Sequence, residues 1–247
     1  MDGDGRCKAI KSIKNSFFQM ISVIRKDMML YVACVAPVLA GLVFKFGIPK
    51  IEKVLCSFYG RTSLLSPYYE LFDMFLAIIT PVMFYFAIAM VILEERDDKI
   101  IKYLIASPLG RKGYLISRFC IPFIIVMTIT LILLPIFMIT KLSLWEIVFL
   151  SFSGTLQGIM IALMIITLSS NKLEGMAVTK LSVLTVFGIA VPYFIKSNIQ
   201  YLCVLLPSFW MGKVLYNESA FFIIPTIIVS FIWILFLINK LARNNFQ

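Results

Sequence analysis

Six long apolar segments dominate this sequence and restrict what it can fold into. A helix needs about 17 to 25 mostly apolar residues to cross the hydrocarbon core of a bilayer. The chain has 61% hydrophobic and 15% charged residues, which is outside the range of soluble domains. The sequence therefore predicts an all-α membrane protein with six transmembrane helices in one domain of residues 28–247. The expected spans cover residues 28–46, 71–93, 119–140, 144–168, 176–195 and 220–238.

The distribution of basic residues predicts the orientation, because lysine and arginine are retained on the cytoplasmic side of membrane proteins. Most of the 23 lie before the first span, in residues 94–118, after the fourth span and at the C-terminus. We therefore expect a multi-pass protein of a bacterial cell membrane with both termini in the cytoplasm. The formal net charge of +10 follows from this topology and from attraction to lipid headgroups. Nucleic acid is not an expected partner.

Residues 1–27 precede the first span and carry apolar residues at helical spacing. This pattern predicts an amphipathic helix that lies in the cytoplasmic membrane interface and also rests on a partner. The alternative is a positively charged anchor that only sets the orientation. The apolar face consists of Ile10, Ile13, Phe17, Met20, Ile21 and Ile24.

A charge-rich segment at residues 94–118 separates the second and third spans. It begins with four carboxylates, continues with an apolar patch and then reaches Ser107 and Pro108. Serine favours a helix start and proline is tolerated at its first position, so the segment predicts helix, turn, helix. We expect another protein to act on this chain here, and the alternative is a solvated loop. The carboxylates are Glu94, Glu95, Asp97 and Asp98, and the apolar patch is Ile100, Ile101, Leu104 and Ile105.

Residues 197–218, on the opposite side, are too apolar for an aqueous loop and too short to cross the membrane. We expect a re-entrant helical pair that forms an outer gate from Pro207, Ser208, Phe209 and Trp210. In that arrangement Ser208 caps the second half-helix and Trp210 closes the exit. The alternative is a surface anchor at the headgroup level, where tryptophan and tyrosine are favoured.

The sequence contains no pattern of catalytic residues. Histidine is absent from the whole sequence, which removes the commonest general base and metal ligand. There is also no G-x-x-x-x-G-K-[ST] phosphate loop, so energy for any active process must come from a partner. We expect no enzyme activity and neither cofactor nor metal in this chain. An external disulfide between Cys56 and Cys203 is left open.

The run ERDDKIIKYLIASPLGR, from Glu95 to Arg111, resembles the first cytoplasmic loop of type-2 ABC transporter permeases. In that family an acidic-Arg-acidic cluster leads through a short coupling helix to a Leu-Leu-x-Ser-Pro ending and an arginine. The family usually has Gly-Thr where this chain has Lys99-Ile100. The stretches SSNKLEGMAVTKLS and LLPSFWMGKVL resemble the start of its fifth span and its outer Pro-Ser-x-Trp element. The matching residues are Glu95, Arg96 and Asp97 in the cluster and Leu104, Ile105, Ser107, Pro108 and Arg111 in the ending.

The resemblance implies a permease subunit of an ATP-driven exporter. Two permease subunits, identical or homologous, would form a pore of twelve helices in the lipid bilayer. Two cytoplasmic ABC ATPase subunits would bind ATP and Mg and act through the coupling helices. The residues expected to couple to the ATPase are Glu94, Glu95, Arg96, Asp97, Ile100, Ile101, Leu104, Ile105, Ser107, Pro108 and Arg111.

The side chains of the spans give an expectation for the cargo. The spans have few ionisable groups at mid-depth, so no ion relay is expected. The aromatic and apolar side chains of the second and fifth spans favour an amphipathic or hydrophobic cargo such as a peptide, drug or lipid. An alternative function is a non-transporting scaffold or immunity subunit with the same fold, which would not co-purify with an ATPase. The expected substrate path consists of Met83, Tyr85, Phe86, Phe187 and Tyr193.

Overall fold

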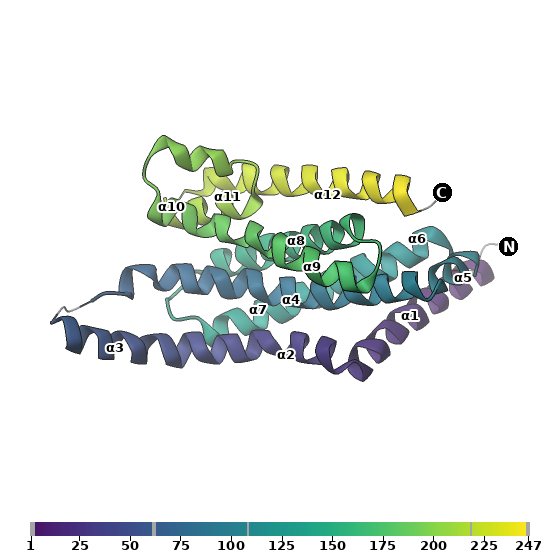
Figure 1. The fold of residues 1–247 in the computed structure, drawn as a ribbon, viewed down its shortest axis with the longest axis horizontal. Helices are drawn as coiled ribbons and strands as arrows, with labels where there is room; N and C mark the ends of the chain where they lie inside the picture. The colour runs from purple at the N-terminus through teal and green to yellow at the C-terminus, as the bar shows by residue number, and fades with distance from the viewer. Residues whose placement is uncertain (1–2, 61–62, 108, 218, 246–247) are drawn as a thin grey trace.

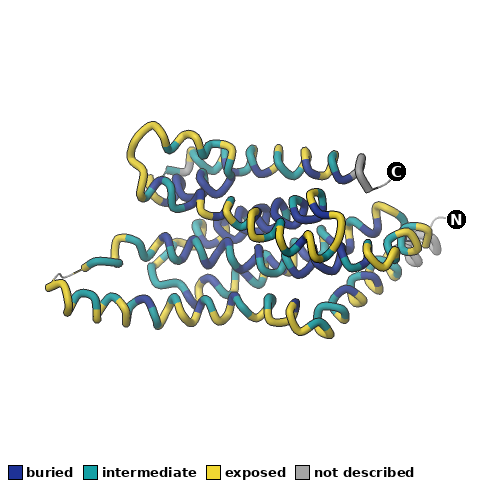
Figure 2. The backbone as a smooth tube through the Cα atoms, in the orientation of Figure 1, coloured by how far each residue is buried: buried dark blue, intermediate teal, exposed yellow. Residues whose placement is uncertain are grey.

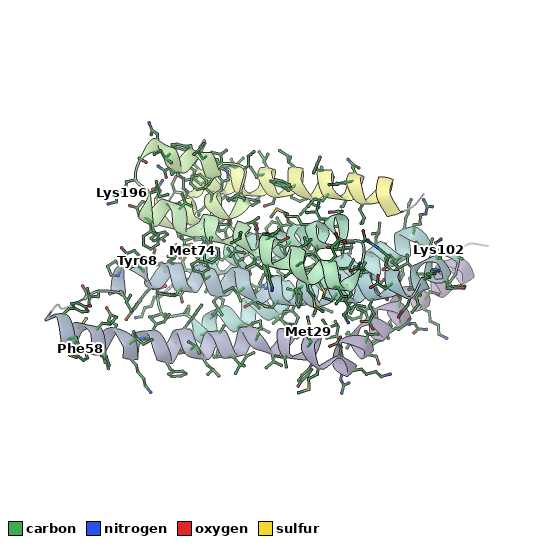
Figure 3. All side chains as sticks on the ribbon, in the orientation of Figure 1. Met29, Phe58, Tyr68, Met74, Lys102 and Lys196 are labelled. Carbon is green, nitrogen blue, oxygen red and sulfur yellow. The ribbon has the colours of Figure 1, made fainter. Side chains whose placement is uncertain are left out.

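The computed structural model describes residues 3–60, 63–107, 109–217 and 219–245, and within these ranges it contains helices and no strands (Figure 1). Six helical stretches are long and apolar enough to cross a membrane, which confirms the predicted all-α membrane fold. The first helix begins, and the last helix ends, at the same end of the bundle (Figure 1). Lys102 lies at that end, and Phe58 and Lys196 lie at the other (Figure 3). The spans are Met28–Tyr59, Ser66–Asp97, Gly110–Phe137, Leu144–Leu168, Lys172–Phe194 and Ile223–Leu241.

Two helices form the centre of the bundle: α4 (Tyr69–Asp97) and α8 (Leu144–Leu168). In an apolar stretch of 18 residues from each span, 78% and 83% of the residues are buried in these two spans, against 17% to 33% in the other four. Figure 2 shows the buried residues concentrated along this pair. Around it pack α2 (Met28–Leu42), α7 (Ile121–Phe137) and α12 (Ile223–Asn245).

Gly154 and Gly158 bring α8 directly onto the backbone of α4. A Cβ atom at Gly154 would overlap the carbonyl oxygen of Ala77, and one at Gly158 would lie 3.0 Å from that of Pro81. Small residues four positions apart let membrane helices approach this closely, and the packing that results is a main source of their association. The G-x-x-x-G pattern of the fourth span is the sequence signal of this contact.

The first span is longer than predicted. α2, the π-helical turn η1 (Val43–Gly47) and α3 (Ile48–Tyr59) form one stretch of 32 residues, whereas the apolar run ends at residue 46. At 1.5 Å per residue the stretch is about 48 Å long, so α3 extends beyond a hydrocarbon core of about 30 Å. Lys50 and Glu52 end the apolar run without ending the helix. The next short helix, η2 (Ser66–Tyr68), is held to α3 by a hydrogen bond of 3.0 Å from the Ser66 N–H to Glu52 Oε1.

The charged segment between the second and third spans is shorter than the predicted range of 94–118. Residues 94–97 are the last turn of α4. Residues 110–118 belong to the third span, in which α6 (Gly110–Leu115) and the π-helical turn η3 (Ile116–Cys120) continue into α7. The connection is therefore residues 98–109, which contain the short helix α5 (Ile100–Ala106).

The fifth span and the outer segment are irregular. The span consists of α9 (Lys172–Ser182), the 3-10 helix η4 (Val183–Ala190) and α10 (Val191–Phe194). The predicted helical pair at residues 197–218 is a 3-10 helix and one α-helix, and a further 3-10 helix leads into the last span. These elements are η5 (Asn198–Cys203), α11 (Pro207–Tyr216) and η6 (Ala220–Phe222). Cys56 and Cys203 are free thiols.

The N-terminal segment forms the predicted helix, α1 (Gly3–Lys26). Met20 on its apolar face is buried, whereas Lys11 and Lys14 on the other face are exposed. Ile10 was expected on the apolar face and is 66% exposed. Asp27 separates α1 from α2 and caps the latter, because its Oδ1 accepts hydrogen bonds from the N–H groups of Met29 (2.9 Å) and Leu30 (3.3 Å).

We expect Gly154→Ala to destabilise the protein by about 1–3 kcal/mol, because α8 must move away from α4 to accommodate the new methyl group. Thermal unfolding of the purified protein in detergent micelles measures the effect. Gly47→Ala is the matched control, since its Cβ would meet only Val43 Cγ1, at an ordinary 3.5 Å. Equal melting temperatures for the two variants would contradict the close α4–α8 contact.

Candidate functional site

The centre of the candidate site is a buried ion pair between Glu95, in the last turn of α4, and Arg118, in η3. Arg118 is fully buried and Glu95 is 6% exposed. The carboxylate also accepts a hydrogen bond from the Tyr114 hydroxyl (2.8 Å), and Arg118 Nη1 donates to the Ser16 carbonyl oxygen of α1 (2.8 Å). We name Ser16, Glu95, Tyr114 and Arg118 the inner polar cluster. It joins α1, α4 and the start of the third span.

Lys172, at the start of α9, holds three carboxylates of the same end. Its Nζ donates to Asp27 Oδ2 (2.9 Å) and Glu94 Oε2 (2.8 Å), and its N–H donates to Asp97 Oδ2 (2.9 Å). The Lys172 ammonium, helped by the Leu30 N–H, holds the pKa of the Asp27 carboxyl below its usual range. The loop between the first two helices is thereby tied to α4 and to the fifth span.

Arg96 completes the cluster of charges and binds backbone rather than a carboxylate. Its two terminal nitrogens donate to the carbonyl oxygens of Ser169 (2.7 Å) and Ile166 (3.1 Å). These are carbonyls at the C-terminal end of α8, which have no partner within their own helix. The predicted coupling residues Glu94, Glu95, Arg96 and Asp97 therefore all bind other parts of this chain, and they fix the end of α4 to its neighbours.

Arg118 and Lys172 were not predicted to be site residues, because in the sequence they contribute only to the distribution of basic residues. Tyr114 and Arg118 are four positions apart, so they lie on the same face of a helix. That spacing, at the start of an apolar span, is a sequence signal for a buried partner. It does not identify Glu95 as that partner.

α5 packs its apolar residues toward the bundle and presents its other face outward. Ile100, Ile101, Leu104 and Ile105 are half-buried, and Ile101 packs against the apolar core. The outward face consists of Lys102, Tyr103 and Ala106, and Tyr103 is 77% exposed. The spacing of the apolar residues in the sequence indicates this outward face, because Lys102, Tyr103 and Ala106 lie opposite the four apolar positions on a helix. Tyr103 is thus the large side chain that α5 offers to a partner.

Both ends of α5 have defined turns. Lys99 has a φ of 59°, in the left-handed region that glycine adopts most easily. The family that this segment resembles usually has glycine at this position. Ser107 forms the predicted turn, since its Oγ donates to the Leu104 carbonyl oxygen (2.6 Å) and accepts from the Leu109 N–H (3.3 Å). Pro108 lies outside the described residues, and Arg111 is exposed.

The predicted substrate-path residues do not form one group. Tyr85 is fully buried and its hydroxyl donates to the Phe119 carbonyl oxygen (3.3 Å), so it belongs to the core. Met83 and Phe86 are partly exposed on α4. Phe187 is 57% exposed, and its ring packs edge-on against that of Phe75, with the centroids 6.1 Å apart. The Tyr193 hydroxyl donates to Glu70 Oε2 (3.4 Å).

The predicted outer gate is part of the folded core. Pro207, Ser208 and Phe209 are buried, and α11 packs on η4. The prediction that Ser208 caps a half-helix is wrong: Leu206 is the N-cap, and Ser208 Oγ donates to the Thr185 carbonyl oxygen (2.5 Å). Trp210 Nε1 donates to the Val204 carbonyl oxygen (2.8 Å), and its ring stacks on Phe222.

A comparison with protein families gives one match. The family described as "Fluoroquinolones export permease protein Rv2686c-like" matches residues 20–242, which is most of the chain and includes all six spans. Searches of characterised proteins and of solved structures found no match.

We expect Glu95→Gln to cost roughly 3–5 kcal/mol of stability, because it leaves the Arg118 guanidinium buried without a counter-charge. The double variant Glu95→Met/Arg118→Met should recover much of the loss, since neither charge is then buried. Melting temperatures in detergent micelles measure both. Asp98→Asn, at the same end but exposed, is the control and should melt like the wild type. A double variant that melts no higher than Glu95→Gln would contradict this account.

Proposed function

The chain belongs to the Rv2686c-like family of fluoroquinolone export permeases, which are type-2 ABC permeases, and we propose that a separate ABC ATPase drives it to export an amphipathic or hydrophobic cargo. Family membership makes it a membrane permease of an exporter and a transport subunit rather than an enzyme. ATP with Mg is bound by the ATPase, and this chain needs no cofactor. The family description favours a drug over a peptide or a lipid as the cargo.

The observation that carries the proposal is the way α5 is attached to the bundle. Glu95 precedes the connection of residues 98–109 and Arg118 follows it. The ion pair therefore holds together the two spans that flank this connection. A force on α5 is therefore transmitted together to α4 and to the third span. α4 in turn contacts α8 through backbone at Gly154. Contact of an ATPase with α5 would thus move the core of the subunit as one unit.

A conduit in this proposal lies between two permease subunits. The α4–α8 core of a single chain is filled with side chains, among them Met74, Tyr85 and Leu150, each fully buried. Met83 and Phe86 of α4, together with Phe187 of η4, remain accessible from outside the core. These three side chains would face the cargo or the second subunit, identical or homologous. The scaffold alternative predicts instead that no ATPase binds α5.

We expect Tyr103→Asp to weaken ATPase binding by roughly 30-fold, the effect of losing a central aromatic contact worth about 2 kcal/mol. Co-purification with the ATPase and ATP-dependent cargo export in proteoliposomes measure the loss. Tyr59→Asp is the matched control, because Tyr59 is similarly exposed but lies at the opposite end. Wild-type binding and export by the Tyr103 variant would refute the role of α5.

The proposed orientation can be tested separately. In a variant with the five native cysteines replaced by serine, a membrane-impermeant maleimide should label Phe58→Cys in intact cells. Lys112→Cys should be labelled only after the cells are permeabilised. Both positions are exposed, so access depends on the side of the membrane alone. The reverse pattern would show that the termini are outside.

A further inference from the structure

A continuous groove opens at the inner end of the bundle, between the third, fourth and sixth spans. Two adjoining cavities share Leu115, Phe119 and Leu241, with volumes of about 610 Å³ for the deeper and about 120 Å³ for the shallower. We name the two together the α7–α8–α12 groove. Every side chain that lines the deeper cavity is apolar apart from Cys120. Those deep in it include Phe123, Phe152, Leu156, Ile159, Phe231 and Ile234.

The length of the groove matches one leaflet of a bilayer. On α8 the lining runs from Phe152 to Leu163, which is about 16 Å at 1.5 Å per residue. On α12 it runs from Phe231 to Leu241, about 15 Å. Half of a hydrocarbon core is also about 15 Å. The groove therefore has the depth of the acyl chains of one leaflet.

The mouth of the groove is positively charged. The shallower cavity is lined by Arg96, Lys99 and Lys102 and by no carboxylate. Of the four nearby carboxylates, Glu94 and Asp97 bind Lys172, Glu95 binds Arg118, and Asp98 is exposed and lines neither cavity. Within the described part of the chain, no carboxylate forms a salt bridge with Lys99 or Lys102. These two ammonium groups remain available to an anion.

We propose that the α7–α8–α12 groove binds an anionic phospholipid of the inner leaflet. Its acyl chain lies between α7, α8 and α12, and its phosphate-bearing headgroup contacts Lys99 and Lys102. Basic pockets between membrane helices on the cytoplasmic side bind anionic headgroups in this way. Which leaflet supplies the lipid follows from the proposed orientation, but the binding itself does not depend on it.

The position of the headgroup gives this lipid a role in coupling. Lys99 forms the turn before α5, and Lys102 lies on its outward face beside Tyr103. A bound headgroup would therefore hold α5 to the membrane surface, next to Tyr114 of the inner polar cluster. The groove and its basic mouth are formed by this chain, so lipid binding does not require the ATPase.

Native mass spectrometry of the purified full chain in detergent micelles tests the proposal. The protein is titrated with dioleoyl phosphatidylglycerol or with dioleoyl phosphatidylcholine, which share acyl chains and differ in net charge. We expect one tightly retained phosphatidylglycerol, bound at least about tenfold more tightly than phosphatidylcholine. Lys99→Gln/Lys102→Gln should weaken phosphatidylglycerol binding by roughly 30-fold, at about 1 kcal/mol per lysine.

Two further variants complete the test. Lys50→Gln/Lys53→Gln removes the same charge from α3, at the other end of the bundle, and this variant should bind phosphatidylglycerol like the wild type. Ile159→Trp fills the groove and should abolish retention of the tight lipid, while a wild-type melting temperature without lipid confirms that this variant is folded. Equal retention of the two lipids, or no effect of the Lys99/Lys102 pair or of Ile159→Trp, would overturn the proposal. So would a disulfide between two copies of Phe231→Cys, which would place a second copy of the chain on the groove.

Discussion

The buried ion pair between Glu95 and Arg118 is the interaction on which the half of the bundle next to the two termini depends. Removing two charges from water costs several kcal/mol each, and the attraction between them offsets this only when their remaining donors and acceptors are satisfied. Here the carboxylate also has the Tyr114 hydroxyl, and the guanidinium also reaches the Ser16 carbonyl and lies 5.4 Å from the Tyr114 ring centroid. The pair therefore fixes the relative positions of α1, α4 and the third span. It also holds together the two spans that flank the connection containing α5.

Hydropathy was sufficient to predict the number of spans but not where they end. A transmembrane helix does not stop where its sequence becomes polar, provided that each polar group finds a partner or reaches water. Lys50 is exposed and the Glu52 carboxylate accepts a hydrogen bond from the Ser66 N–H, so α3 continues past them, whereas Arg118 enters the third span because Glu95 neutralises it. Basic residues that indicate orientation in the sequence can thus be structural residues in the fold. Only the three-dimensional arrangement shows which of them are.

The candidate site was predictable in its position and not in its contacts. The resemblance located α5 and its Ser107 turn, and both are present. It did not show that Glu94, Arg96 and Asp97 bind this chain, because their partners lie about 70 or more positions away in the sequence. Ser208 of α11 likewise binds outside its own helix, because its partner Thr185 lies 23 positions earlier, on the fifth span. A short polar motif specifies its own local turn, whereas its long-range partners depend on how the helices pack.

The two faces of α5 make different kinds of contact. The face that packs on the bundle is apolar and close to the inner polar cluster, so α5 cannot move far without moving α4 and the third span. The other face carries Tyr103, an aromatic side chain suited to a protein contact, and Lys102, a cation suited to an anionic headgroup. An ATPase and a lipid would then contact neighbouring residues of a single helical turn. Because the two contacts are adjacent, the charge of the membrane surface would influence how firmly α5 is held when the ATPase acts on it.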